Sequence, residues 1–402
     1  RRHPPGPLPL PLIGNLHSLG NKPHLALYKM YQKYGNVFRL RMGAVETVVL
    51  TEPATLHEAF VDNPTMFVDR YQRESRMLWN SGEAFDPINL VKICSLNIIF
   101  RFLFSHHFSY DLNGEAGEIV HLINHCFHLA GAKIPDDFIP LMKRFRRSRS
   151  DLMNDYIDTN IKVCKYIESI ITIRLKTFNP DEEPKDILDH YLQEYFNGTI
   201  PLDGIVYSFA DLVAAGTDSS ANTVSALIKA MANRPKYQEL MYCELSTITG
   251  EPTIAHKNST QLTNAIIKET IRRYPTAPLG VPHAATEDCE FRGYHIKKGT
   301  QIFLNIYSTF MSPNVWQDPE EFDPNRFMGE DNPNNKIVRY IFGVGPRNCL
   351  GAALAEQELF LLTSILFKKF KFVRTTEEMM NEDMLFGLAF VPTPFQVKVE
   401  KR

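Results

Sequence analysis

The sequence predicts a mainly α-helical fold with a few small β-sheets. Apolar residues recur at helical spacing through most of the chain from Pro53 to about residue 275. One pattern, from Leu202 to Asn233, is apolar on most faces, which is typical of a helix that runs through the middle of a core. A doubly wound sheet is not expected, because strands do not alternate with helices and no glycine-rich phosphate motif follows a strand.

The first elements along the chain are a helix and a β-hairpin. Residues 22–34 have helical apolar spacing and are followed by Gly35, a residue that often ends helices. The runs VFRLRM, from Val37, and VETVVL, from Val45, alternate apolar and polar residues. They should therefore pair as two adjacent strands.

The later elements are mostly helices. The polar stretch NPDEEP, residues 179–184, should be a loop between two of them. Short strands are expected near FRGYHI, residues 291–296, and in the last twenty residues.

The composition of the chain excludes some classes of protein. The 402 residues carry 44 Lys+Arg and 46 Asp+Glu, so the net charge of −2 lacks the basic excess of a nucleic-acid-binding domain. The six cysteines form no CxxC pair and are too sparse for a disulfide scaffold, which favours a reducing compartment. No apolar run is long enough to cross a bilayer.

Residues 1–20 form a proline-rich arm, RRHPPGPLPLPLIGN and the five residues after it. Proline favours stiff, extended chain. The arm is either a rigid terminal extension or a spacer that follows a removed membrane anchor, with its two arginines on the cytoplasmic side.

The stretch FGVGPRNCLG, residues 342–351, surrounds one cysteine with glycines. A clear helix follows it, so Cys349 lies just before a helix N-terminus, where free N–H groups favour an anion such as a thiolate. Two functions fit this position. A nucleophile would need a base, and no histidine is near in sequence. A thiolate ligand of haem iron fits as well, and Arg347 would suit a haem propionate.

The spacing F-x-x-G-x-x-x-C-x-G resembles the haem-ligand signature of the cytochrome P-450 family. The resemblance implies the cytochrome P-450 fold, a helical haem domain with small β-sheets, over residues 21–402. It also implies that haem b is bound with Cys349 as the axial thiolate on iron. Phe342, Gly351 and Arg347 would then contact the cofactor.

Two arginines and a glutamate complete a second family motif. Glu269 and Arg272 in KETIRR lie three apart and share a helix face. Arg326 in FDPNRF resembles the arginine that joins this pair in the family. The resemblance implies a buried structural triad that holds the Cys349 loop.

The third motif is AAGTDSS, from Ala214 to Ser220, midway along the long helix. Glycine there should weaken the helix and open it locally to dioxygen and water. The resemblance makes Asp218 and Ser219 the acid and hydroxyl that relay protons. Serine stands where the family has threonine, but it keeps the hydroxyl that donates and accepts a proton.

Further site residues come from the resemblance alone. His283 in VPHAAT occupies the place of a propionate-binding side chain. The segments PTAPLG and FGLAF and the long helix should line a hydrophobic substrate pocket. The residues expected to line it are Phe209, Val213, Ala214, Thr276, Leu279, Val281, Phe386 and Leu388.

One region departs from the family. Between FVDRY and SGEAFDP the family carries a helix with a tryptophan and an arginine for the second propionate, whereas here only a few residues separate the two segments. We therefore expect that a segment of several dozen residues is missing near Gln72–Arg73. Much of the roof over the substrate would belong to it.

The resemblance implies a monooxygenase that inserts one oxygen atom from O₂ into a lipophilic small molecule. NADPH-derived electrons would come from a diflavin reductase, for which Lys368, Lys369 and Lys371 are candidate docking residues. The microsomal type of the resemblance implies the cytoplasmic face of the endoplasmic reticulum membrane, and we expect a monomer. The alternatives are a haem-thiolate isomerase or dehydratase that needs no reductase, and a non-catalytic haem-binding protein.

Overall fold

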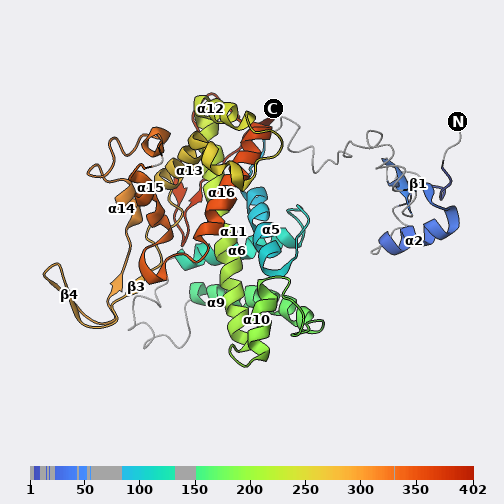
Figure 1. Cartoon of the computed structure of the whole chain (residues 1–402), viewed down its shortest axis with the longest axis horizontal. Coiled ribbons are helices and arrows are strands. Elements are labelled where there is room, and N and C mark those ends of the chain that lie inside the picture. Colours follow the sequence, from blue (N-terminus) through green and yellow to red (C-terminus); the bar gives the residue numbers. More distant parts are fainter. Residues whose placement is uncertain are drawn as a thin grey trace. The chain divides into compact units, whose positions relative to one another are not determined.

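The computed structural model describes residues 4–9, 15, 18, 23–42, 45–51, 55, 84–131, 151–329 and 331–402. The chain forms two compact units, Arg1–Met77 and Leu78–Arg402, each of which is described by itself (Figure 1). The division inferred from the sequence, an arm of residues 1–20 and one domain of residues 21–402, stays a prediction.

The first unit contains the helix and hairpin that the sequence predicts. Helix α2 spans Pro23–Tyr34, and strands β1 (Val37–Met42) and β2 (Val45–Leu50) are antiparallel, with Val37 opposite Leu50. Phe38 and Leu40 of β1 are buried, as their alternation with polar neighbours requires. Pro5 of the proline-rich arm accepts a hydrogen bond from the N–H of Arg39 at 2.9 Å.

The second unit is mainly helical. Its α-helices are α5 (Ile88–Phe104), α6 (Glu115–Gly131), α9 (Asp151–Leu175), α10 (Ile187–Phe196), α11 (Leu202–Asn233), α12 (Pro235–Ser246), α13 (Gln261–Arg273), α14 (Ile306–Phe310), α15 (Asn334–Ile337) and α16 (Ala352–Lys369). Its 3₁₀ turns are η2 (Ile254–Ser259), η3 (Pro324–Phe327), η4 (Val338–Phe342) and η5 (Gly345–Arg347).

The strands described in this unit pair as two-stranded antiparallel sheets: β3 (His283–Ala284) with β6 (Gln301–Ile302), β4 (Cys289–Phe291) with β5 (Tyr294–Ile296), β7 (Phe370–Arg374) with β10 (Val397–Lys401), and β8 (Met384–Leu385) with β9 (Val391–Pro392). The strands near residues 291–296 and at the C-terminal end agree with the sequence prediction. The stretch 179–184 connects α9 to α10, as its polar composition predicts.

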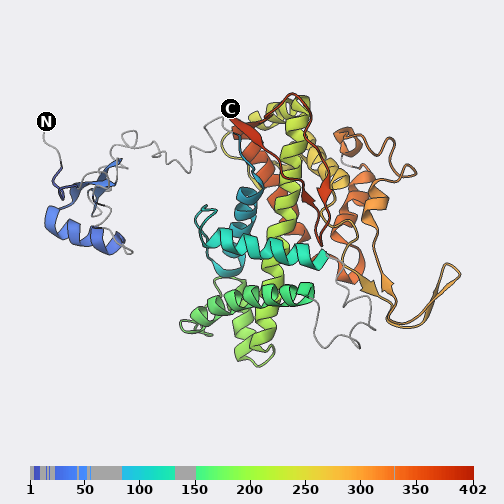
Figure 2. The same ribbon diagram turned by 180° about the vertical axis from the view of Figure 1, so that it is seen from behind.

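Helix α11 runs through the centre of this unit (Figure 1). Its N-terminal half packs in an apolar cluster with α5, α6, α9 and α10, and its C-terminal half packs in a second cluster with α12, α13 and α16. Seen from behind, α6 and α9 lie side by side across α11 (Figure 2). Helix α11 thus contributes buried residues to both apolar clusters, which explains why most of its faces are apolar.

Gly216 marks the close approach of α5 to α11. A Cβ atom added to Gly216 would lie 2.4 Å from Cδ1 of Ile99, so a larger residue would push the two helices apart. Helix α11 is continuous from Leu202 to Asn233. The expectation of a local opening at this glycine is therefore wrong, since the glycine serves helix packing instead.

The C-terminal hairpin is fastened to α11 by a buried lysine. Lys229 Nζ donates to the carbonyls of Asn381, at 2.9 Å, and Thr393, at 2.6 Å, and to Thr393 Oγ1 at 2.8 Å. Burial lowers the pKa of Lys229 to about 8. These bonds fix the base of the β8–β9 hairpin on the core.

In the part of the chain that the structure describes, no helix combines the length and the apolar character needed to cross a membrane.

Candidate functional site

The cysteine loop connects η4 to α16. Gly343 and Gly345 adopt φ angles of +75° and +79°, a region that favours glycine, and the N–H of Cys349 donates to the carbonyl of Phe342 at 2.7 Å. Gly351 is the N-cap residue of α16, and no side chain caps the first turn of that helix. The sequence prediction that Cys349 lies just before a helix N-terminus is confirmed.

The thiol of Cys349 faces open space. It is exposed and free of any disulfide, and among the described residues no group donates a hydrogen bond to Cys349 Sγ. Val344 is 53% exposed and Leu350 is 87% exposed, so the loop also carries apolar side chains with free surface. A Cβ atom added to Gly351 would have no neighbour within 4 Å.

These features fit a flat, apolar cofactor that is ligated by sulfur. The exposed apolar side chains provide contact area, the thiol provides an axial ligand, and the uncapped first turn of α16 stabilises a thiolate. Arg347 is exposed and makes no ion pair with another described residue, so its guanidinium is available to a carboxylate. His283 lies on β3 and is also exposed. The contacts of Phe342, Arg347 and His283 with haem stay predictions.

Glu269 and Arg272 form a buried ion pair on α13. Arg272 Nε lies 2.7 Å from Glu269 Oε2, and Arg272 Nη2 lies 2.8 Å from Glu269 Oε1, with both side chains 0% exposed. Arg326 Nε lies 3.6 Å from Glu269 Oε1. The structure thus brings the three residues of the predicted triad together.

The hydrogen bonds of the triad reach the segment before the cysteine loop rather than the loop itself. Arg272 donates to the carbonyls of Phe310 and Pro319, both at 2.8 Å, and Glu269 Oε1 accepts from the N–H of Asp323 at 2.8 Å. The Arg326 carbonyl accepts from the side chain of Asn334, in α15, at 2.9 Å. The hydrogen bonds of the triad thus end at α15, and its support of the Cys349 loop stays a prediction.

Asp218 and Ser219 lie in different environments. Asp218 is 0% exposed and forms an ion pair with Lys92 of α5, and Asn222 Nδ2 donates to its other carboxylate oxygen at 2.8 Å. Lys92 also donates to Asn124 of α6. Ser219 is half-buried and donates to the carbonyl of Ala215 at 2.9 Å. The two side chains are adjacent in sequence but do not bond to each other.

Glu358 of α16 is a buried carboxyl group that the sequence analysis missed. It is 3% exposed, and burial raises its pKa to about 7. The hydroxyls of Ser95 and Ser220 partly stabilise its charge, yet Glu358 Oε1 completes no well-formed hydrogen bond. Its sequence signal is a glutamate on the apolar face of the helix after the cysteine.

Glu358 should make the stability of the fold depend on pH. Its folded-state pKa of about 7 exceeds its ordinary value of 4.5, so its stabilising contribution is complete below pH 4.5 and is lost as the pH rises through 7. Ionisation at pH 8 should cost about 3 kcal/mol. In urea unfolding, the loss of stability between pH 5 and pH 8 should be smaller in Glu358→Gln by about 2 kcal/mol.

The control for this prediction is Glu356→Gln, two residues earlier on the same helix. Glu356 is 27% exposed and has charged neighbours, so its replacement should leave the pH dependence near that of the parent. If the free energy of unfolding depended on pH equally in Glu358→Gln and in the parent, Glu358 would already be ionised in the folded state.

The predicted pocket residues do not line one described cavity. Phe209 and Val213 are 0% and 1% exposed and pack in the core beside α5. Thr276 is buried, and Ala214 and Leu279 are half-buried. Val281, Phe386 and Leu388 are exposed. The substrate pocket formed by these eight residues stays a prediction.

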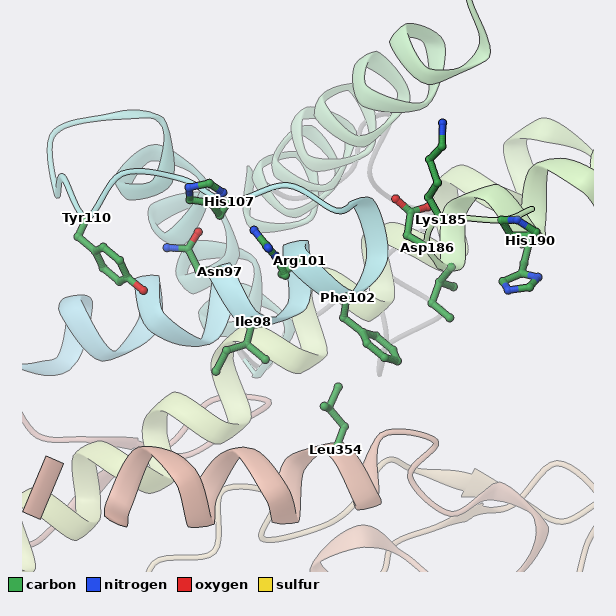
Figure 3. A pocket seen from close by; sticks show the side chains of 12 residues that line it. Asn97, Ile98, Arg101, Phe102, His107, Tyr110, Lys185, Asp186, His190 and Leu354 are labelled. Carbon is green, nitrogen blue, oxygen red and sulfur yellow. The ribbon is translucent and has the colours of Figure 1, made fainter. Parts of the chain in front are cut away.

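A different cavity, of about 710 Å³, opens between α5, α10 and α16 (Figure 3). Phe102 of α5 and Leu354 of α16 point toward each other across it, and Ile98 extends the apolar surface. Helix α5 is apolar on nearly all faces, as buried helices are, yet Phe102 is 51% exposed here.

Comparisons with known proteins identify relatives over nearly the whole chain. The family model for cytochrome P-450 matches residues 4–80 and 75–399. The protein named "Probable cytochrome P-450 513D1" of Dictyostelium discoideum is 32% identical, with 99% of this chain and 94% of the relative covered. "Probable cytochrome P-450 513A3" of the same organism is 33% identical, with the same two shares covered.

The relatives contain positions that this chain lacks. The first alignment runs over 489 positions although the chain has 402 residues, so at least 87 positions (489 less 402) have no counterpart here. The two family matches meet at residues 75–80. Both facts accord with a segment missing near Gln72–Arg73, which lies outside the described residues, and the omission stays a prediction.

Proposed function

Because this chain belongs to the cytochrome P-450 family, we propose that it is a haem-thiolate monooxygenase that inserts one oxygen atom of O₂ into a lipophilic small molecule. The second oxygen atom is reduced to water with electrons derived from NADPH. The observation that carries the proposal is the loop that presents the exposed Cys349 thiol at the uncapped start of α16.

When haem b is bound, it supplies the oxygen chemistry, and the protein supplies binding, orientation and proton control. Cys349 would hold the iron, and Arg347 and His283 would hold the propionates. Phe342 and Gly351 would contact the bound cofactor. Val344 and Leu350, the exposed apolar residues of the loop, would add apolar contact area for the bound cofactor.

Proton delivery falls to Ser219 and Asp218. The Ser219 hydroxyl donates to the Ala215 carbonyl at 2.9 Å, and its own lone pairs stay free to accept a proton. Asp218 is held by Lys92 and Asn222. In this ion pair Asp218 carries no proton, so it would first take one from the Lys92 ammonium or from solvent and then pass it to Ser219, which in turn would give up its own hydroxyl proton.

The partner that supplies electrons is a diflavin reductase, at the cytoplasmic face of the endoplasmic reticulum membrane, and the protein acts as a monomer. The candidate docking residues are Lys368 and Lys369, at the end of α16, and Lys371, on β7. Lys368 Nζ donates to the carbonyl of Ile248 at 2.6 Å, and Lys369 lies 2.7 Å from Glu251. Ion pairs between exposed side chains are weak, so these contacts are compatible with docking of a partner.

The test is product analysis under heavy-isotope dioxygen. The haem-loaded protein is incubated with a lipid and terpenoid extract, NADPH and a diflavin reductase, and products are separated by mass. We expect a product that carries one heavy oxygen atom and is absent without NADPH. An unlabelled, rearranged product that forms without NADPH would contradict the proposal and support the isomerase alternative.

The same assay tests the role of Ser219. Ser219→Ala should lower product formed per NADPH consumed by about tenfold or more, since a positioned proton donor contributes at least that much. Ser219→Thr retains the hydroxyl and should recover most of the yield. Equal yields in all three proteins would remove Ser219 from the proton path.

A further inference from the structure

A second cavity lies between α13, α15, η4 and α16. Its lining has an apolar part and a charged part. Its volume of about 310 Å³ falls within the range of small-molecule sites, about 300–1,000 Å³. The apolar part of the lining consists of Ile267, Ile271, Val338, Phe342 and Leu359. Four basic side chains and one carboxylate also line it: Lys257, Lys268, Lys336, Arg339 and Glu356.

The basic side chains are not neutralised within the cavity. Glu356 is shared between Lys257, at 3.6 Å, and Arg339, at 3.5 Å, and both distances are longer than a direct hydrogen bond. Lys268 Nζ donates to the neutral side chain of Asn335 at 2.9 Å. Lys336 forms no ion pair with any described residue. Four cations therefore face a single carboxylate.

The positively charged side chains of this cluster repel one another. Burial, together with the cations of Lys257 and Arg339, lowers the pKa of Lys268 and outweighs the attraction of Glu356. A bound anion would remove this repulsion. The excess of three positive charges suits a ligand that carries two negative charges, as a phosphate monoester does near neutral pH.

The shape of the cavity favours a small molecule over a flat protein surface. Ile267 and Leu359 are 6% and 4% exposed, so the apolar part lies deep. Lys336 and Arg339 are exposed, so the charged part lies at the rim. A ligand that matches both parts has an anionic head and an apolar body.

We propose that this cavity binds an organic phosphate. The phosphate lies among Lys268, Lys336 and Arg339, and the apolar body packs against Ile267 and Leu359. Phe342 lines the same cavity, and its carbonyl accepts the N–H of Cys349 at 2.7 Å. The ligand would thus contact the residue that closes the thiol loop, at a site separate from that of the proposed monooxygenase substrate.

The test is calorimetric titration of the full chain, haem-loaded, with decyl phosphate as the probe. Decanol lacks the charge, and inorganic phosphate lacks the apolar body. Decyl phosphate should bind at least about tenfold more tightly than either, because only it uses both parts of the cavity. Binding is read directly as heat, so the result does not depend on turnover and stands apart from the test of the proposed function.

Two charge variants locate the site. Lys336→Gln and Arg339→Gln should each weaken decyl phosphate about three- to tenfold, and the double variant should weaken it further. Lys398→Gln is the matched control, because Lys398 is an exposed lysine on β10, far along the chain from the cavity. Circular dichroism confirms that each variant keeps its fold.

Three outcomes would overturn the proposal. Equal binding of decanol and decyl phosphate would show an apolar site without anion recognition. Equal weakening by Lys398→Gln would show only general attraction to a charged surface. Binding of an acidic peptide, but not of decyl phosphate, at Lys336 and Arg339 would assign the cavity to a protein partner.

Discussion

Replacement of Cys349 by serine is expected to abolish the absorption band that identifies thiolate-bound haem in the reduced, carbon monoxide-treated protein. Serine keeps the size of the side chain but is a far weaker donor to iron than a thiolate. Turnover should fall by about 100-fold or more, since even the loss of a residue that only orients a metal ligand costs 10–100-fold. The measurement is the difference spectrum, followed by the labelled-oxygen assay.

Cys243→Ser provides the matched control. Cys243 is also exposed and free, but it lies on α12, away from the glycine-bounded loop. Its replacement should leave both the spectrum and the turnover unchanged. A thiolate band that persists in Cys349→Ser would show that another cysteine ligates the iron, and it would overturn the assignment of the loop.

Replacement of Arg272 by methionine is expected to destabilise the fold far more than the removal of a solvent-exposed arginine. Arg272 has no exposed surface and holds Glu269 through two bonds as well as three backbone carbonyls. Its removal leaves the Glu269 carboxylate buried without its main partner. The free energy of unfolding in urea should fall by about 3–5 kcal/mol.

The neighbouring arginine supplies the control. Arg273 pairs with Glu320 at 2.8 Å, but Glu320 is 70% exposed, so Arg273→Gln should cost at most about 1 kcal/mol. Arg272→Lys should not restore stability, because lysine cannot reproduce the planar set of donors. If Glu269→Gln and Arg272→Met were additive in a double-mutant cycle, the two side chains would not interact, contrary to the structure.

The sequence predicted the elements whose patterns are local. The long helix has the bounds Leu202–Asn233 that its apolar pattern indicates, because a helix buried on most sides needs apolar residues all round. The hairpin from Val37 follows from strict alternation. The cysteine loop was recognisable because its backbone angles at Gly343 and Gly345 favour glycine, so the conformation of the loop is reflected in its residue types.

These sequence patterns could not predict contacts between segments that are distant in the chain. Lys92 lies 126 positions before Asp218, and no periodicity connects the two. One signal was present, since Lys92 is the one charged residue between Asp86 and Arg101, in a mostly apolar stretch, and a buried charge needs a partner. Its partner could not be named. Gly216 was misread for a similar reason, because the neighbour that requires a glycine, Ile99, lies on another helix.

The residues predicted to line the substrate pocket also show that sequence patterns do not predict which groups pack together. Phe209 and Leu388 are both apolar, yet one has no exposed surface and the other is 42% exposed. Residue type predicts a preference for apolar surroundings but does not distinguish protein from ligand as the neighbour. That distinction depends on which helices pack together, and therefore on the tertiary structure.

The bonds of Lys229 to the C-terminal hairpin bear on how this fold can evolve. They join α11 to backbone carbonyls of Asn381 and Thr393, which are present whatever side chains the hairpin tip carries. Phe386 and Leu388 at the tip are exposed, so mutations there remove little buried contact. Evolution can therefore replace the residues at the hairpin tip, and so change the ligands that they favour. The bonds of Lys229 meanwhile keep the hairpin in its place on the core.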